Sequence, residues 1–201
     1  MSNRTRVIYY YIERGLINNI NGGDAMFEFR GDILESDADI ICHQVNCSGV
    51  MKAGLAKQIA QRYPMVEKEY MDLTHPCSMP PSNDYKHILL GTIQNVKISD
   101  HQYICNIFGQ LGYGRQKICY TDYVAFEKAL NELGIFCTEL YNNKLLEDEK
   151  HSIKPSKITV AFPHGIGCGL ANGNWTHISA LILHFEAKFK NVATVEIWKK
   201  M

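Results

Sequence analysis

The sequence predicts an α/β protein, a three-layer α/β/α sandwich around a central mixed, mostly parallel sheet. Two observations lead to this fold class. Short apolar runs alternate along the chain with longer segments of helical periodicity, as in proteins built from strand–helix units. Several of the runs are apolar throughout, which is typical of strands covered by helices on both faces. At 201 residues the chain is long enough to bury the core of one such domain.

The expected strands are the apolar runs of the chain, at residues 26–31, 39–45, 87–93, 102–108, 157–163 and 193–198. Apolar residues recur on one stripe of the expected helices, at 52–63, 120–136 and 174–189. A Pro-rich stretch at 75–84 and a charged stretch at 142–157 are predicted to be loops. Residues 1–25 precede the first strand as an N-terminal extension that either packs as an added element or is poorly ordered. The domain is therefore expected to span residues 26–201.

The composition excludes several classes of protein. Lys+Arg and Asp+Glu are equal at 21 each, so no overall charge indicates nucleic acid or a membrane surface as partner. The seven cysteines are odd in number and scattered, without a C-x-x-C pair, which favours buried free thiols over disulfides or zinc ligands. No apolar run approaches the ~18 residues of a membrane span. We expect a soluble, cytoplasmic protein that needs no metal or cofactor.

Glycine is concentrated after three of the expected strands, in "HQVNCSGVMKAG" (43–54), "FGQLGYGRQK" (108–117) and "PHGIGCGLANGNW" (163–175). In α/β folds, ligands bind at the carboxyl ends of the strands. Glycine there lets backbone amides approach a ligand, and a helix N-terminus adds further N–H donors, so the pattern suits phosphate. One such loop would be an ordinary turn, but three on one edge favour a phosphate-containing ligand. The spacing matches neither a G-x-G-x-x-G nor a G-x-x-x-x-G-K-[ST] motif.

Asp32 follows the first expected strand, in "RGDIL". A carboxylate at such a place most often caps a helix or turn. It could equally accept a hydrogen bond from the exocyclic amine of a base.

These segments carry a resemblance to a known family. "GDILESDADIICHQVNCSGVMKAGLAKQI" together with "PHGIGCGLANGNW" resembles a macrodomain, the ADP-ribose-binding module, and the likeness covers residues 26–198. "GDI" is similar to the family's opening motif, "VNCSGVMKAG" to its ribose-facing loop and "GIGCGL" to its phosphate loop, in the family's order. The nearest branches are the ADP-ribose 1''-phosphate phosphatases and the enzymes that remove terminal ADP-ribose from proteins or DNA.

The resemblance implies a role for each matching residue. Asp32 would bind the adenine amine, Asn46 would face the distal ribose, and Gly54 would let its loop close over that sugar. The amides of residues 167–170 would cradle the diphosphate, residues 109–114 would form the opposite wall, and Trp198 would border the adenine. The implied substrate-binding residues are Asp32, Ile33, Asn46, Cys47, Gly54, Leu55, Gly109, Tyr113, Gly114, Gly165, Ile166, Gly167, Cys168, Gly169, Leu170 and Trp198.

The chain also departs from the family pattern. Lys52 stands where the relatives usually have glycine, and its ammonium could contact a terminal phosphate or lie in solvent. The branch that removes ADP-ribose uses a lysine nucleophile, but Tyr120 stands in that register here, with Lys117 three residues away. Ala171 replaces a second catalytic carboxylate of that branch. Both departures weigh against a covalent lysine mechanism.

The candidate catalytic residues are His43, Lys52 and Lys117, with His164 and Cys47 as further possibilities. His43 takes a position often occupied by asparagine and could act as a general base or acid near C1'' of the distal ribose. The competing interpretation of a strand histidine is a buried, hydrogen-bonded side chain. Cys47 could act only with a lowered pKa, and such a cysteine is more often just small and buried. His164 could equally be structural.

The favoured hypothesis is a hydrolase acting at the distal-ribose end of an ADP-ribose derivative, of the ADP-ribose 1''-phosphate phosphatase type. The second is a mono-ADP-ribosyl hydrolase acting on a modified protein or nucleic acid. The third, from a different class, is a reader module that binds ADP-ribose without turning it over. ADP-ribose or a derivative is the expected partner in all three.

Overall fold

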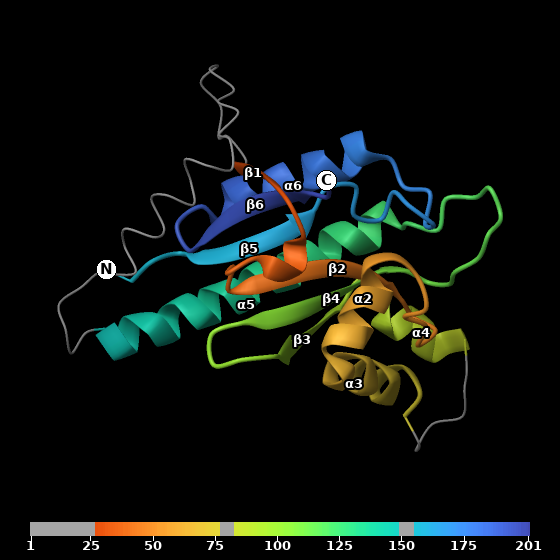
Figure 1. The fold of residues 1–201 in the computed structure, drawn as a ribbon, viewed down its shortest axis with the longest axis horizontal. Helices are drawn as coiled ribbons and strands as arrows, with labels where there is room; N and C mark the ends of the chain where they lie inside the picture. The colour runs from red at the N-terminus through yellow and green to blue at the C-terminus, as the bar shows by residue number, and fades with distance from the viewer. Residues whose placement is uncertain (1–26, 77–82, 149–154) are drawn as a thin grey trace.

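A computed structural model describes residues 27–76, 83–148 and 155–201 of the chain (Figure 1). The predicted extension at 1–25 lies outside the described residues. Six strands form one sheet in the order β1-β6-β5-β2-β4-β3. Their bounds are β1 Phe27–Arg30, β2 Ile40–Asn46, β3 Ile93–Lys97, β4 Tyr103–Gln110, β5 Ile158–Pro163 and β6 Ala193–Lys199. All neighbouring pairs are parallel except β3 and β4, so the predicted mixed, mostly parallel sheet is confirmed.

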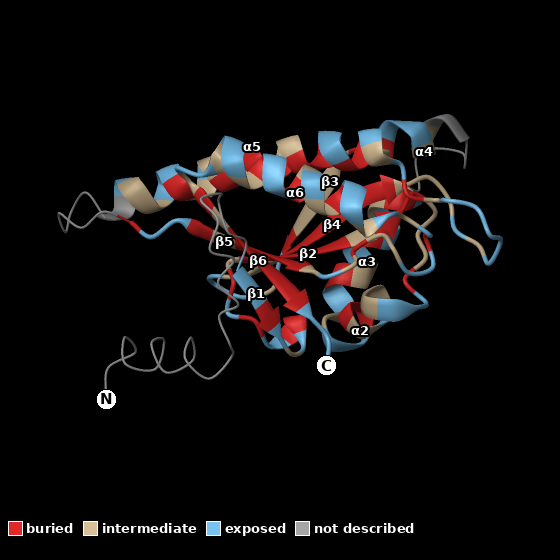
Figure 2. Cartoon of the chain, turned by 90° about the horizontal axis from the view of Figure 1, so that it is seen from above, coloured by how far each residue is buried: buried red, intermediate tan, exposed pale blue. Residues whose placement is uncertain are grey.

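Helices cover both faces of the sheet, which confirms the three-layer sandwich (Figure 2). One core cluster lies between the sheet and helices α5 (Tyr123–Asp148) and α6 (Trp175–Phe189). A second lies on the opposite face, against the short helix η1 (Ile33–Glu35) and helices α2 (Gly54–Arg62) and α3 (Pro64–Thr74). Strand β2 supplies both clusters, since Ile40 and Cys42 belong to the first whereas Ile41 and Val45 belong to the second. This alternation follows from the two-residue period of a strand.

The apolar run at 87–93 is not a strand, contrary to the prediction. Its first part belongs to helix α4 (Asn83–Leu89), and a turn with Gly91 at φ +86° leads into β3, which begins only at Ile93. Ile88 is exposed while Leu89 is buried, a one-sided burial that a short apolar run does not reveal. Residues 98–102 connect β3 to β4.

One helix, α5, is longer than predicted, and helices α3 and α4 are additional to those predicted. The loop predicted at 142–157 is wrong over its first residues, because α5 runs on to Asp148 and buries Tyr141 against the first cluster. Helix α3 is absent from the sequence prediction. It begins with Pro64 in the first turn, where a missing N–H costs nothing, and it buries Val66, Tyr70 and Thr74 at four-residue spacing.

The remaining sequence-level expectations concern the cysteines and the membrane. Cys42, Cys47, Cys105 and Cys137 are buried free thiols, as predicted, whereas Cys119 is exposed. None of the helices in the described part of the chain is both long enough and apolar enough to cross a membrane.

Candidate functional site

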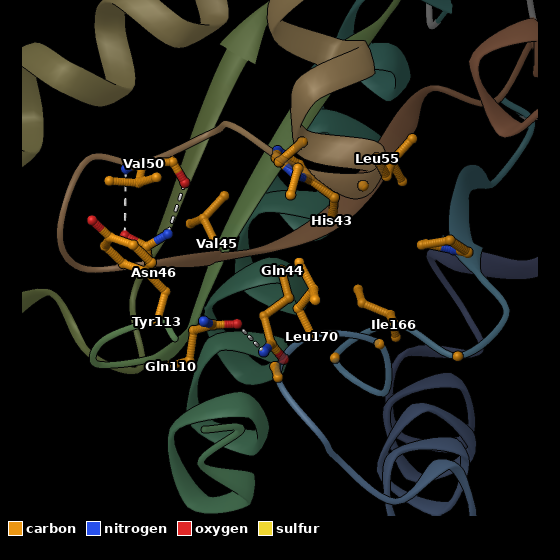
Figure 3. Close-up of a pocket in the computed structure, with 18 of the residues that line it drawn as sticks. His43, Gln44, Val45, Asn46, Val50, Leu55, Gln110, Tyr113, Ile166 and Leu170 are labelled. Atoms are coloured by element: carbon orange, nitrogen blue, oxygen red, sulfur yellow. Dashed lines mark hydrogen bonds between the residues drawn. The ribbon is translucent and has the colours of Figure 1, made fainter. Parts of the chain in front are cut away.

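A cavity of about 630 Å³ opens at the carboxyl ends of β2, β4 and β5 (Figure 3). Its walls come from the three glycine-rich segments and from the start of α2. The volume lies within the range of ordinary small-molecule sites, and the place is where parallel α/β sheets bind ligands. The predicted site residues that line it are His43, Asn46, Lys52, Gly54, Leu55, Tyr113, Gly114, Gly165, Ile166, Gly167, Gly169 and Leu170.

The other predicted residues do not line this cavity; they are Asp32, Ile33, Cys47, Gly109, Lys117, Cys168 and Trp198. Asp32 caps η1, since its carboxylate accepts a hydrogen bond from the Leu34 amide at 3.0 Å. Trp198 is buried in the core, where its ring stacks on Phe29 with centroids 5.2 Å apart. Its indole N–H donates to Glu196 at 2.8 Å. In the cavity as it stands, neither Asp32 nor Trp198 forms part of the wall.

Asn46 organises the loop that follows β2. Its Oδ1 accepts hydrogen bonds from the amides of Ser48 (2.9 Å) and Val50 (3.4 Å), and its Nδ2 donates to the Val50 carbonyl (2.8 Å; Figure 3). From α3, the Tyr70 hydroxyl donates to the Asn46 carbonyl (2.6 Å) and accepts from the Val50 amide (3.1 Å). Because an amide nitrogen carries two hydrogens, one Nδ2 hydrogen of Asn46 is left for a ligand.

His43 begins a chain of hydrogen-bonded polar side chains across the sheet, of which His43 and Asn106 are buried. Its Nε2 contacts Oδ1 of Asn106 on β4, Asn106 Nδ2 donates to Gln94 Oε1 on β3 (2.9 Å), and Gln94 Nε2 donates to the Glu69 carbonyl of α3 (3.0 Å). The backbone carbonyl at the far end can only accept, so each amide in turn has a fixed orientation. His43 therefore carries its hydrogen on Nε2 and a lone pair on Nδ1.

Burial also fixes the charge of His43, which is 2% exposed. Burial lowers the pKa of His43 to about 4, and the hydrogen bond with Asn106 opposes this only in part. Its Nδ1 is buried without a hydrogen-bond partner among the described residues. The ring is accordingly neutral at physiological pH, with an unprotonated Nδ1 that is a weaker base than that of an exposed histidine.

Basic side chains alone supply charge to the cavity wall. Lys52 comes from the loop after β2 and Arg115 from the segment after β4, and both are exposed. No aspartate or glutamate lines the cavity among the described residues. Charges of one sign along a concave wall raise the local concentration of an oppositely charged ligand, so the wall of this cavity favours an anion.

The loop after β5 turns tightly, with Gly165 and Gly167 at φ +74° and +71°. The Cys168 amide donates to the Gly165 carbonyl at 2.8 Å, so one of the four amides predicted for the diphosphate is already used. The amides of Gly167, Gly169 and Leu170 donate to no group in the described part of the chain. Unpaired N–H groups at a concave turn are the donors that a phosphate requires.

The remaining nucleophile candidates lack activation. Burial raises the pKa of Cys47 to about 12, so its sulfur is a thiol rather than a thiolate. Lys117 is exposed outside the cavity wall. The Tyr120 hydroxyl donates to Gln116, beneath Gly114, where an added Cβ would lie 2.1 Å from the hydroxyl oxygen.

Several lining residues were not among the predicted site residues. Gln44, Gln110 and Arg115 are the polar ones. His164, a further catalytic possibility in the sequence, does line the cavity, beside Trp175 with ring centroids 4.6 Å apart. All of them lie within the glycine-rich segments. Residue type alone did not separate them from ordinary loop residues.

No protein-family model matches the chain. An ADP-ribose 1''-phosphate phosphatase of Saccharomyces cerevisiae (strain YJM789) is 34% identical over 91 residues, which are 44% of this chain and 50% of the yeast protein. The chain thus spans about half the length of the curated relative that it matches.

Solved structures match almost the whole chain. The macrodomain of Mycobacterium tuberculosis DarG aligns with a TM-score of 0.61 at 21% identity, over 88% of this chain and 98% of the other. The chain has the macrodomain fold. A macrodomain protein from Streptomyces coelicolor gives a TM-score of 0.62 at 20% identity, over 87% and 98% of the two chains. Thermosipho africanus DarTG, solved in complex with ADP-ribose, gives a TM-score of 0.57 at 19% identity, over 87% of this chain and 42% of that chain.

Proposed function

We propose that this macrodomain binds an ADP-ribose derivative in its cavity and hydrolyses it at the distal-ribose end, as an ADP-ribose 1''-phosphate phosphatase. The proposal rests mainly on the cavity wall, which combines two basic side chains with three unpaired amides. No acidic residue is among the described residues that line it. The partial likeness to the yeast phosphatase and to a macrodomain solved with ADP-ribose supports the same ligand.

The wall has complementary groups for a ligand with more than one phosphate. The amides of Gly167, Gly169 and Leu170 would hold the diphosphate. Lys52, on the loop after β2, would attract the terminal phosphate, and Arg115 would add charge from the segment after β4. A ligand without the terminal phosphate would leave part of this positive charge unused.

His43 would take one proton of the water as the water oxygen bonds to phosphorus. The bond from phosphorus to the C1'' oxygen would break, and that oxygen would leave as part of ADP-ribose and take a proton from solvent. Nδ1 of His43 is buried and has no partner among the described residues, and its lone pair is free because Asn106 holds the hydrogen on Nε2. A ring with a pKa of about 4 stays neutral above that pH, so the base form is present throughout the physiological range.

The alternative reaction, removal of ADP-ribose from a protein or nucleic acid, has less support. Its lysine nucleophile would have to be Lys117, which lies outside the cavity wall, and Ala171 at the wall offers no carboxylate. A reader module would bind ADP-ribose in the same cavity, and only a turnover assay distinguishes it from the proposed enzyme.

A substrate panel separates these functions. Purified protein is given ADP-ribose 1''-phosphate, ADP-ribosylated protein and ADP-ribosylated DNA, and phosphate or ADP-ribose release is measured. We expect phosphate release from the first substrate alone. Release of ADP-ribose from a macromolecule supports the second function, and binding without any turnover supports the reader.

Two lysine variants provide a matched control. Lys52→Ala should raise the KM for ADP-ribose 1''-phosphate by roughly tenfold, as expected for one charge-assisted contact. Lys117→Ala removes an equally exposed charge outside the wall and should leave KM unchanged. Equal effects of the two variants would contradict a specific role for Lys52.

A further inference from the structure

Gln44 links the three walls of the cavity. It lies on β2, and its Nε2 donates to Oε1 of Gln110 at the end of β4 (2.9 Å) and to the hydroxyl oxygen of Thr121 (3.0 Å; Figure 3 shows the first bond). Thr121 in turn donates to the carbonyl oxygen of Gly167 in the loop after β5 (2.8 Å). Two side chains therefore join β2, the wall after β4 and the phosphate loop.

The direction of these bonds is fixed by their outer ends. Gln110 donates through its own Nε2 to the Gly112 carbonyl (2.8 Å), so its Oε1 is the acceptor that faces Gln44. The Thr121 hydroxyl hydrogen is committed to the Gly167 carbonyl, so its oxygen accepts from Gln44. The amide of Gln44 can serve both neighbours only as a donor.

Close packing supports the same arrangement. A Cβ added to Gly167 would lie 2.5 Å from Gln44 Oε1, and one added to Gly109 would lie 2.8 Å from the same atom. The phosphate loop and the end of β4 thus rest directly on the Gln44 amide. Both glycines are needed for contact with this side chain, in addition to any approach to a ligand.

The hydrogen bonds to the Gly167 carbonyl fix the orientation of that carbonyl in the phosphate loop. Its carbonyl oxygen accepts from Thr121 and also from the Gly173 amide (2.9 Å), at the base of the loop. A carbonyl oxygen turned toward the cavity would repel an anionic ligand. Held at the base, it leaves the unpaired amides of Gly167, Gly169 and Leu170 as the groups available to a diphosphate.

We infer that Gln44 and Thr121 are a positioning pair that fixes the phosphate loop for the diphosphate of the ligand. Neither residue needs to touch the reacting atoms. The inference rests on the proposed function for the identity of the ligand, whereas the effect on the loop itself does not depend on any ligand.

Thr121 allows a matched test, because two substitutions differ in the hydroxyl. Thr121→Val keeps the branched shape and loses both bonds, whereas Thr121→Ser keeps the hydroxyl and loses only a methyl group. We expect Thr121→Val to speed amide hydrogen exchange in residues 165–173 and to weaken ADP-ribose binding by about tenfold in calorimetry. Thr121→Ser should stay within roughly twofold of wild type in both measurements.

Gln44→Glu is the second variant, with almost the same shape. A carboxylate cannot donate to Gln110 or Thr121, and it places negative charge next to Gly167. Its ADP-ribose affinity should fall below that of Gln44→Leu, which loses the same bonds without adding charge. Denaturation curves of both variants identify any loss that comes from unfolding, and the Thr121 pair decides the matter if neither variant folds.

The two readouts separate this inference from the proposed function. If wild-type protein does not bind ADP-ribose, the proposed function is wrong, while the exchange data still test the loop. If Thr121→Val exchanges and binds like wild type, or if Thr121→Ser behaves like Thr121→Val, the positioning pair is wrong even though ADP-ribose is the ligand.

Discussion

His43 and Gln44 are consecutive residues of β2 whose side chains belong to opposite faces of the sheet. His43 connects across the sheet, through Asn106 and Gln94, to the backbone of α3. Gln44 connects outward, through Gln110 and Thr121, to the loops around the cavity. One strand thus serves two purposes at its carboxyl end. It sets the protonation of a candidate base on one face of the sheet, and it supports a candidate binding loop on the other.

The largest difference is expected when His43 loses its ring. His43→Ala should lower the turnover of ADP-ribose 1''-phosphate by at least roughly 100-fold, the usual contribution of a general base. Binding of ADP-ribose should change little, because the loop amides remain. Phosphate release and calorimetry measure the two quantities separately. Full turnover in this variant would remove His43 from the mechanism.

Acid should lower the free energy of unfolding through His43. The folded state holds the pKa of His43 at about 4, below the ordinary value of 6.5, so the unfolded chain binds more protons between these two values. The contribution of His43 to the free energy of unfolding is complete above about pH 6.5 and is lost as the pH falls toward 4, by up to roughly 3 kcal/mol. Denaturant curves between these pH values measure the loss, and His43→Gln should reduce it.

Substitutions of Asn106 should have a smaller effect than loss of the His43 ring, and they test the chain of hydrogen bonds from His43 through Asn106 and Gln94. Asn106→Asp places a carboxylate against the ring and should raise the pKa of His43 by roughly one to three pH units. The acid limb of the activity profile should move upward by the same amount, since only the neutral ring acts as a base. Asn106→Leu, which adds no charge, is the control. An NMR titration in which both variants keep the wild-type pKa would refute the network.

The smallest effect is expected at Tyr70, which braces the loop after β2 and makes no contact with the Gln44 network. Tyr70→Phe removes the hydroxyl that joins the Asn46 carbonyl to the Val50 amide and should lower the free energy of unfolding by about 1–3 kcal/mol. ADP-ribose affinity should fall by only a few-fold. A denaturation midpoint equal to wild type would mean that the loop is held by Asn46 alone.

Most strands of the sheet were predictable from the sequence because each is a continuous apolar run bounded by loop residues. The prediction failed at residues 87–93, where a short apolar run fits a turn of helix as well as a strand. It also missed helix α3, which begins at Pro64. Both errors are local ambiguities that only packing resolves.

The site was predicted in part, for a related reason. Glycine spacing located the three loops, but Asn106 and Gln94 are distant from His43 in the chain and meet it only because β2, β4 and β3 are neighbours. Strand order is not written in local sequence. Gln44 lay inside a predicted motif, yet its role depends on Thr121, which follows another strand.

Calorimetry on two glycine variants tests directly whether the cavity binds ADP-ribose through its phosphate loop. Gly167→Ala puts a Cβ at a φ of +71° and 2.5 Å from Gln44 Oε1, whereas Gly112→Ala meets nothing within 4 Å. We expect wild-type binding of ADP-ribose in about the micromolar range, at least roughly tenfold weaker binding by Gly167→Ala, and no change in Gly112→Ala. Absence of binding by the wild-type protein, or equal affinity in all three, would contradict binding through this loop.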